Sequence, residues 1–188
     1  MPGVVIVIGA AAALGLWLTL RLYNRLVALR NKVRNAWSDI DVQLSFRHDL
    51  VPNLVESVRG YMNHERETLE AVTKARSAAM TAGADIAKRA VAEMALTGAV
   101  GNLFATAERY PELKASQNFL LLQEQLTTTE NRIAFARQRY NETVRQFNTL
   151  IAEFPWNLLA ATFGYSPEKM FAADARDRTA VQVTHSVQ

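Results

Sequence analysis

Residues 3–20 read GVVIVIGAAAALGLWLTL and contain no charged side chain. As an α-helix rising ~1.5 Å per residue, they would extend about 27 Å, close to the ~30 Å hydrocarbon core of a bilayer. Five basic residues then precede the first acidic one: Arg21, Arg25, Arg30, Lys32 and Arg34. Because basic residues accumulate on the cytoplasmic side of a span, the pattern predicts one transmembrane helix with its N-terminus outside and the rest of the chain in the cytoplasm.

Two other interpretations of this stretch compete with a membrane anchor. A cleaved signal peptide has a basic start and small residues after its apolar centre, whereas the first three residues are uncharged and residues 10–13, all alanine, lie in mid-stretch. A buried core helix fits poorly with the sharp charge boundary at Arg21. We therefore expect an anchor over residues 1–21, in contact with the lipid bilayer.

The composition of the remaining chain indicates one helical domain with an ordinary surface. Five of the 21 Lys and Arg lie in the flank, which leaves 16 against 18 Asp and Glu, so the high pI does not indicate a nucleic-acid partner. The chain has no cysteine, which excludes disulfides and cysteine-based metal sites. Only 8 Gly and 5 Pro occur among 188 residues, and strand patterns are scarce, so we expect an all-α fold.

The first long helix is predicted to follow the anchor directly. Apolar residues recur at helical spacing from Leu22 to Met62. Pro52 lies within this stripe. Because the stripe continues on both sides of it, the pattern favours a kink in the helix at Pro52 over the end of the helix. Residues 64–82 are also helical in pattern, and the sequence leaves open whether they continue the first helix.

Two further helices follow a turn at residues 81–85. Asp85 fits the N-cap of a helix from Ile86 to about Arg109, ended by Pro111. Its apolar residues are Val91, Met94, Val100, Leu103 and Phe104. Ser116 fits the start of a second long helix. The stripe of that helix comprises Phe119, Leu122, Leu126, Ile133, Ala136, Tyr140, Val144, Phe147 and Ile151.

A short helix is expected between Pro155 and Gly164, since proline suits a helix start and glycine a helix end. Two long helices with one apolar stripe each must bury those stripes together. The predicted architecture is therefore an N-terminal transmembrane helix followed by an elongated antiparallel helical bundle with two long helices over residues 22–171. Residues 172–188 form a loosely held tail in this prediction.

A series of short segments occurs in the order that one known family shows. They are YNRLVALRN (23–31), NAWSDIDVQL (35–44), RHDLVPNLV (47–55), HE (64–65), YPELKA (110–115), NF (118–119), TENRIA (129–134), RYN (139–141) and FP (154–155). Through these segments the chain resembles the LemA family of bacterial membrane-anchored helical proteins. The resemblance implies a single span in the bacterial cytoplasmic membrane, N-terminus outside, and a cytoplasmic bundle. It supplies no catalytic residue, and it associates some relatives with membrane compartments and others with a membrane metalloprotease.

Catalytic and metal-binding patterns are absent from the sequence. His48 and His64 would lie about 24 Å apart on a continuous helix and on nearly opposite faces, and Glu65 does not complete an H-E-x-x-H motif. No phosphate-binding glycine loop and no G-x-S-x-G turn occurs. We therefore expect neither an enzyme nor a bound metal or cofactor.

Asparagine repeats on the two long helices are candidate assembly or specificity positions. Tyr-Asn pairs begin both series, and the next asparagine follows seven residues after the first: Asn24, Asn31 and Asn35 on one helix, Asn141 and Asn148 on the other. An asparagine beside an apolar seam lowers stability but can fix the register or choice of partner. Ordinary solvated amides are an equally good interpretation.

Charged residues interrupt the first apolar stripe just before Pro52. Arg47, His48 and Asp49 stand where an apolar side chain is expected. They suggest either a polar pocket or partner contact, or an Arg47 that extends its apolar stem along the bundle edge to reach water, and we expect the latter.

The sequence thus favours a membrane-tethered scaffold that assembles with copies of itself through long helices. Small residues four positions apart within the span weakly favour the same self-association: Gly9 with Ala13, and Ala11 with Gly15. The alternative is a regulatory adaptor for another membrane protein, such as a membrane metalloprotease.

Overall fold

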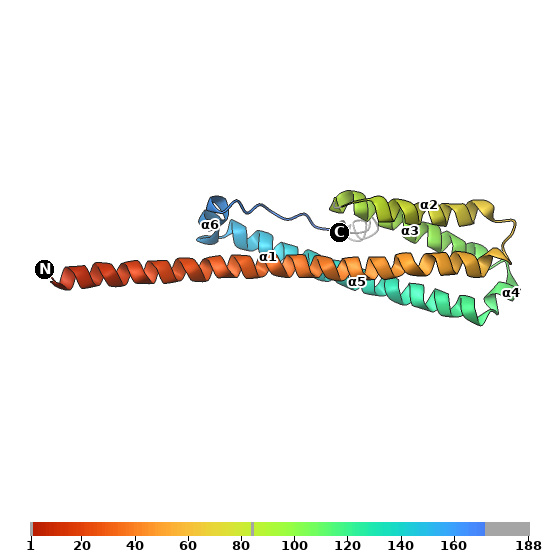
Figure 1. Ribbon diagram of the computed structural model, residues 1–188, viewed down its shortest axis with the longest axis horizontal. Helices are drawn as coiled ribbons and strands as arrows, with labels where there is room; N and C mark the ends of the chain where they lie inside the picture. The colour runs from red at the N-terminus through yellow and green to blue at the C-terminus, as the bar shows by residue number, and fades with distance from the viewer. Residues whose placement is uncertain (1, 84, 172–188) are drawn as a thin grey trace, which may run out of the picture. The chain divides into compact units, whose positions relative to one another are not determined.

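The structure, a computed structural model, describes residues 2–83 and 85–171, and every regular element in that part of the chain is helical (Figure 1). The predicted all-α fold is confirmed. The predicted tail, residues 172–188, lies outside the described residues. The helices are α1 (Pro2–Arg59), α2 (Arg66–Thr81), α3 (Ile86–Ala107), α4 (Pro111–Lys114), α5 (Gln117–Ala152) and α6 (Trp156–Thr162).

Helix α1 carries both the apolar stretch and the first half of the bundle. It continues across Pro52, as predicted from the apolar stripe on both sides of that residue. It ends at Arg59, however, and residues 60–65 form a turn in which the amides of Tyr61 and Met62 donate to the Val58 carbonyl. A continuation of α1 past His64 is therefore excluded. Gly60 follows the helix end directly, where its low helix propensity favours termination.

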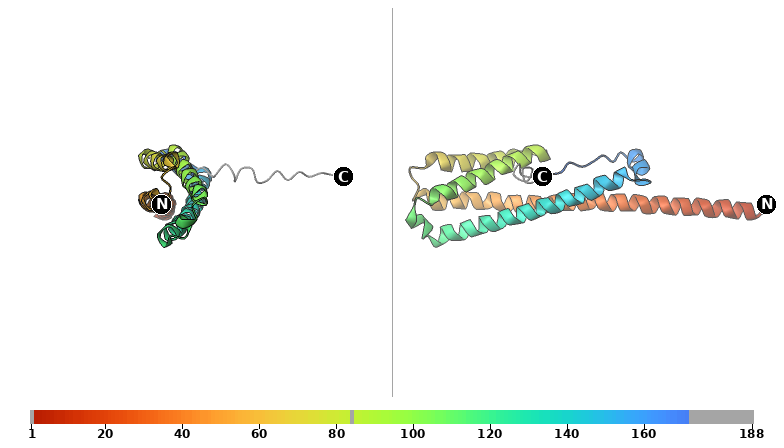
Figure 2. Two further views of the ribbon diagram at one scale, coloured as in Figure 1. Left: turned by 90° about the vertical axis from the view of Figure 1, so that its right-hand side faces the viewer. Right: turned by 180° about the vertical axis from the view of Figure 1, so that it is seen from behind.

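Helices α2 and α3 form an antiparallel hairpin, which both views show side by side (Figures 1 and 2). Gly83 has a φ of +71° in the connecting turn, a conformation that glycine adopts without strain. The Asp85 side chain accepts hydrogen bonds from the amides of Ala87 and Lys88, so the predicted N-cap is confirmed. The predicted apolar face of α3 is partly wrong, because Val91 is exposed whereas Glu93 is fully buried.

Helix α5 begins directly after Ser116, as predicted, and every residue of its predicted apolar stripe is buried. Thr129 fills the gap in that stripe and donates its hydroxyl to the Gln125 carbonyl, which satisfies it within the helix. Helix α6 starts after Pro155, and Gly164 follows its end with a φ of +68°. Both boundaries match the predicted short helix.

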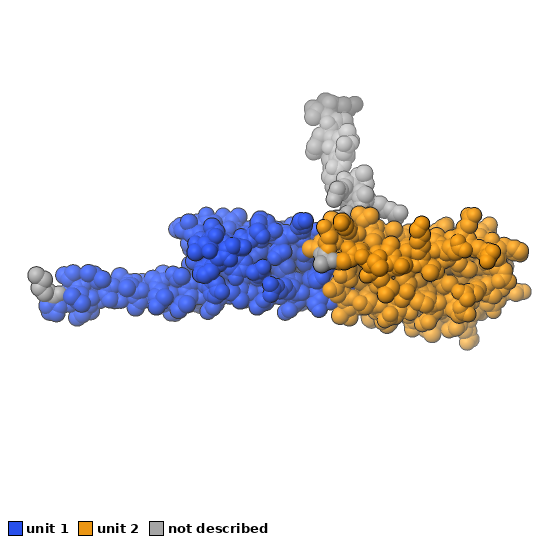
Figure 3. All heavy atoms as spheres, turned by 45° about the horizontal axis from the view of Figure 1, so that its top comes forward, with its two compact units in different colours: residues 1–40, 136–170 blue, residues 41–135, 171–188 orange. Residues whose placement is uncertain are grey.

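The chain divides into two compact units (Figure 3). Unit 1 contains residues 1–40 and 136–170, and unit 2 contains residues 41–135 and 171–188. In unit 1, α1 and α5 run antiparallel: Trp37 packs edge-on against Tyr140 with ring centroids 5.3 Å apart, and Asp39 lies 3.5 Å from Arg139. In unit 2, parts of α1, α2, α3, α4 and α5 enclose a continuous apolar core that includes Leu54, Leu96 and Leu122.

Candidate functional site

Arg47 lies inside the bundle of unit 2, with only 3% of its side chain exposed. Its Nη1 donates to the Thr97 hydroxyl at 2.8 Å and to the Glu130 carboxylate at 2.5 Å, and its Nη2 donates to the Glu93 carboxylate. The expected solvent-reaching arginine is therefore wrong, and the alternative, a polar pocket, is correct. Two carboxylates and a hydroxyl accept from the two terminal nitrogens of the guanidinium, which favours burial of the charge, whereas its Nε is buried without a hydrogen-bond partner.

Glu93 is the fully buried anion of this site. One of its carboxylate oxygens accepts from Arg47, and the other lies 3.0 Å from Nε2 of His48. Burial raises the pKa of the Glu93 carboxyl, but the His48 hydrogen bond and the Arg47 charge outweigh it and hold the pKa below its ordinary value of 4.5. Adjacent residues of α1 thus hold one carboxylate of α3 in its charged form.

The same site reaches the two remaining long helices of unit 2. The Thr97 hydroxyl lies 2.5 Å from Glu130 on α5 and 3.1 Å from the Glu93 carbonyl. From α2, Nε of Arg76 donates to the His48 carbonyl at 2.7 Å. We call this set the ion network: Arg47, His48, Arg76, Glu93, Thr97 and Glu130. It joins α1, α2, α3 and α5.

The chemistry of the ion network suits a structural role. Arg47 and His48 of α1 pair with Glu93 of α3, Arg47 also pairs with Glu130 of α5, and Arg76 of α2 donates to the His48 carbonyl, so the network links four helices at one level of the bundle. A cavity of about 280 Å³ opens beside it, lined by Arg47 and Glu130 at one end and by apolar residues including Phe104 and Leu126. Arg47, Thr97 and Glu130 in its wall already pair across the helices, and a ligand that used them would have to displace those bonds.

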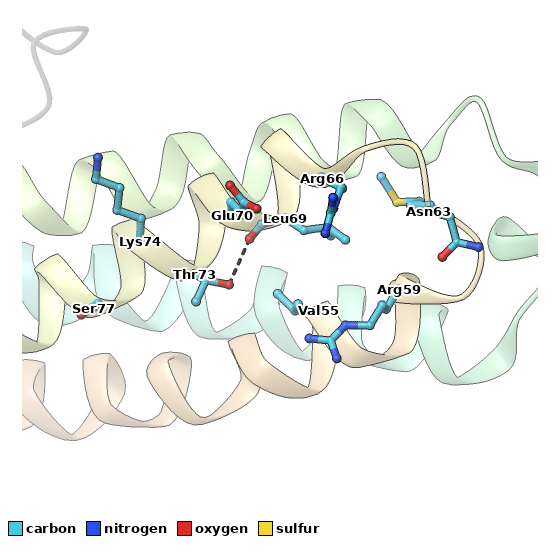
Figure 4. A pocket seen from close by; sticks show the side chains of 10 residues that line it. Val55, Arg59, Asn63, Arg66, Leu69, Glu70, Thr73, Lys74 and Ser77 are labelled. Atoms are coloured by element: carbon cyan, nitrogen blue, oxygen red, sulfur yellow. Dashed lines mark hydrogen bonds between the residues drawn. The ribbon is translucent and has the colours of Figure 1, made fainter.

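A larger groove of about 650 Å³ lies between the end of α1 and α2 (Figure 4). Arg59, Arg66 and Lys74 line it together with Glu70. Arg59 also lies 3.3 Å from Glu56, and both side chains are mostly exposed. Charged groups of both signs that reach water are typical of a solvated surface groove.

The histidines of the described chain are not brought together. His48 is buried in the ion network, whereas His64 is exposed in the turn after α1. Within residues 2–83 and 85–171, no group of three His, Asp or Glu side chains is arranged to hold a metal ion. His185 lies outside the described residues.

The five predicted flanking basic residues all lie on α1 beyond its exposed apolar end. Lys32 and Arg34 are exposed. The other three stack on aromatic rings with centroid distances of 5.1 to 5.2 Å: Arg21 over Trp17, Arg25 over Trp156 and Arg30 over Tyr165. Two of these rings belong to α6 and the segment after it, which sequence spacing alone could not associate with α1.

The predicted asparagine positions divide into two kinds. The three on α1, namely Asn24, Asn31 and Asn35, are exposed, whereas Asn141 and Asn148 on α5 are half-buried. The Asn148 amide donates to the Glu168 carbonyl and accepts from the Glu168 amide, each at 2.9 Å. Asn148 therefore holds the segment after α6 within its own chain, although its spacing on α5 matches that of Asn31 on α1.

Glu93, the most buried member of the ion network, is not among the residues predicted from the sequence. A signal for it existed, because Glu93 is the sole acidic residue of α3 and is followed by an uncharged run to Ala107. A lone carboxylate on so apolar a helix is expected to have a cationic partner. Arg47 and His48, the charged residues that interrupt the apolar stripe of α1, are the candidate cationic partners.

Two described helices, α1 and α3, are long and apolar enough to cross a membrane by length and composition alone. The two helices differ in burial. In α3, 33% of the apolar window is buried in the fold, whereas no part of the apolar window of α1 is buried. Residues 2–21 of α1 are exposed throughout. An N-terminal apolar helix of this kind is compatible with membrane anchoring.

Comparison with known proteins gives one family across most of the chain. Protein LemA of Metamycoplasma hominis is 27% identical over 161 residues, which cover 86% of this chain and 74% of that protein. Magnetosome protein MamQ 2 of Paramagnetospirillum magneticum is 33% identical, and Magnetosome protein MamQ of Magnetospirillum gryphiswaldense is 30% identical. Each of these two matches spans 73 residues, 39% of this chain and 27% of the relative. Residues 36–185 match the LemA family, and the chain belongs to that family.

Proposed function

We propose that this LemA-family protein is a membrane-anchored scaffold without catalytic activity, which assembles with copies of itself on the cytoplasmic side of the bacterial inner membrane. The observation that carries the proposal is the apolar end of α1, where residues 2–20 contact no other part of the described fold closely enough to be buried. A soluble protein rarely exposes so large a contiguous apolar surface, and a bilayer is the solvent that removes the cost of doing so.

The orientation follows from the flanking charges. Arg21, Arg25, Arg30, Lys32 and Arg34 lie on the bundle side of the apolar segment, and the opposite end carries no Lys or Arg side chain. Basic flanks are retained in the cytoplasm, so the bundle is cytoplasmic and the N-terminus faces outward.

The scaffold role is supported by the internal pairing of the bundle's charges and by the surface of α1. In the ion network the buried Glu93 carboxylate pairs with Arg47 and His48, which suits a rigid support better than a reaction centre. On α1 within unit 1, Asn24, Asn31 and Asn35 are exposed and spaced by seven and four residues, which places them along one side of the helix. Such a polar line is suited to fixing the register of a helix from another copy.

Membrane anchoring is tested by placing a charge in the middle of the apolar segment. Ala11→Arg adds about 2.5–3.5 kcal/mol to the free energy of insertion at a helix centre, so the variant should be extracted from membranes by an alkaline wash that leaves the unmodified protein in the pellet. Phe135→Arg is the matched control, because Phe135 is also exposed but lies on α5 in unit 2. Release of the unmodified protein by the same wash would refute the anchor.

Orientation is tested with reporters fused after Gln188. A reporter active only in the cytoplasm should function there, and one active only after export should not. Replacing the five flanking basic residues with glutamine should give mixed orientation. Purification of the native complex distinguishes the scaffold from a regulatory adaptor, since a stoichiometric foreign membrane protein in place of further copies would favour the adaptor.

A further inference from the structure

The region around α6 exposes three large apolar side chains in unit 1. Phe154 is 76% exposed, Leu158 60% and Phe163 54%. Single exposed apolar residues are ordinary on a protein surface, but three within ten residues, with Trp156 and Tyr165 beside them, make an unusually aromatic segment.

This segment is held against α1 directly after the apolar end of that helix. Phe163 packs against Tyr23 with ring centroids 4.9 Å apart, and Trp156 lies under the Arg25 guanidinium. Figure 3 shows unit 1 as a narrow rod at one end that widens further along. Figure 1 places α6 at that point beside α1.

The position along α1 sets the depth at which α6 would lie. Tyr23 and Arg25 follow Leu20 by three and five residues, which is about 4.5 to 7.5 Å along the helix axis. A bilayer of ~40–45 Å with a ~30 Å hydrocarbon core has a headgroup layer of roughly 5 to 7.5 Å on each side. If α1 spans the bilayer up to Leu20, α6 lies at the level of the headgroups.

The charges at this level are complementary to an anionic lipid surface. Arg21 and Arg25 are exposed on α1, and Arg25 lies over the Trp156 ring of α6. A cavity of about 400 Å³ between α1 and α5 begins near this level at Arg25 and extends beyond it to Lys32, with Arg145 and Glu153 also in its wall. Aromatic rings and arginines are the side chains that favour the boundary between lipid headgroups and acyl chains.

We propose that α6 and its neighbours form a second membrane contact: Phe154, Leu158 and Phe163 insert into the headgroup layer of the bilayer that α1 spans, and Arg21 and Arg25 bind anionic lipid headgroups there. The proposal rests on the membrane anchor proposed above. Through it, the bundle is held at the membrane surface at two places rather than through one helix alone.

The absence of cysteine from the chain allows single spin labels to report depth in the full-length protein. Leu158→Cys and Phe163→Cys variants are labelled with a nitroxide and reconstituted into vesicles of equal phosphatidylglycerol and phosphatidylcholine. Collision with oxygen, which is enriched in lipid, is compared with collision with a water-soluble nickel chelate. Leu14→Cys is the control inside the span, and Phe135→Cys is the control on the bundle surface.

The expected result is that both α6 labels lose nickel accessibility relative to Phe135→Cys and give a depth between the two controls. The depth should decrease in vesicles of phosphatidylcholine alone, and Arg21→Gln with Arg25→Gln should remove this dependence on lipid charge. Leu158→Cys is the safer reporter, because Phe163 also packs on Tyr23.

Three outcomes would overturn the proposal. If the α6 labels match Phe135→Cys while Leu14→Cys lies in lipid, the anchor stands and the second contact fails. If Leu14→Cys is accessible to nickel, the anchor itself fails, and the second contact fails with it. If the α6 labels are shielded from both reagents, protein covers them, and a further copy of the chain replaces lipid as the occupant.

Discussion

Arg47 of α1 and Glu93 of α3 form an ion pair whose side chains are 3% and 0% exposed. Removing one partner of such a pair leaves an uncompensated buried charge, which typically costs about 3–5 kcal/mol. We therefore expect Arg47→Ala or Glu93→Ala to lower the free energy of unfolding by about that amount, measured by urea denaturation of unit 2. Arg59→Ala is the matched control, because the Arg59–Glu56 pair is exposed and such pairs contribute about 0–1 kcal/mol. Equal effects of the buried and exposed changes would contradict the geometry described for Arg47.

Replacing both charges together should be far milder than removing one. Arg47→Met combined with Glu93→Leu removes the buried pair and fills its volume with apolar side chains, and such exchanges are often neutral or stabilising. Glu130, which is 36% exposed, keeps access to water in this variant. The double variant should therefore recover most of the stability lost in Glu93→Ala. A double variant as unstable as the single one would show that the two residues do not act as a pair.

The ion network predicts a specific sensitivity to acid. The pKa of Glu93 is lowered in the folded protein, so its contribution is fully present above its ordinary value of 4.5 and is lost as the pH falls toward the lower, folded pKa. The difference in unfolding free energy between the unmodified protein and Glu93→Gln should therefore be constant from neutral pH to about pH 5 and shrink below it. Denaturant midpoints measured across this range test it, and a difference independent of pH would contradict a charged Glu93.

At alkaline pH, Tyr140 should behave differently from an exposed tyrosine. Burial and the nearby Glu168 charge raise the pKa of Tyr140 to about 12, and its hydroxyl donates to the Lys169 carbonyl at 2.9 Å. A raised pKa means that the stabilising contribution is present below about pH 10 and is lost as the pH rises toward 12. Ultraviolet titration of tyrosinate, with Tyr140→Phe subtracted, should show this late ionisation. Ionisation of Tyr140 together with the bulk tyrosines would contradict its burial.

Asn148 and Asn31 should respond differently to the same substitution. The Asn148 amide holds both backbone groups of Glu168, so Asn148→Leu should lower the melting temperature and loosen the segment after α6, at a cost of about 1–3 kcal/mol. Asn31 is exposed, and Asn31→Leu should leave melting essentially unchanged. Any change in oligomer distribution should appear in Asn31→Leu alone. Identical behaviour of both variants would contradict the division between internal and surface asparagines.

Most of the fold was predictable because periodic apolar residues dictate it. The stripe of α5 is predicted residue by residue, as are the N-cap at Asp85, the start of α5 after Ser116 and the end of α6 before Gly164. The end of α1 is not predicted by the sequence, because a glycine such as Gly60 only weakens a helix. In the structure, Met62 is buried in the core, and this burial favours the turn after Arg59.

The candidate site was harder to predict because its parts are far apart in the sequence. Arg47 interrupts an apolar stripe and is therefore noticeable in the sequence. A single sequence does not show which carboxylates pack against it, so the sequence alone predicts that Arg47 reaches water. Glu93 was overlooked because Val91, two residues away, was the better apolar candidate for the buried face of α3, yet Val91 is exposed. Asn148 and Asn31 each follow another asparagine by seven residues, so their spacing in the sequence is the same. They differ because Asn148 bonds Glu168 in the segment after α6, a contact that the spacing does not predict.

The central claim, a membrane-anchored scaffold that assembles with itself, is tested most directly by the protein mass of the detergent-solubilised full chain. Light scattering at micromolar concentration should give a multiple of the 21.0 kDa chain mass that does not change on moderate dilution. A protein mass of 21.0 kDa under the same conditions would contradict self-assembly and leave an anchored monomer.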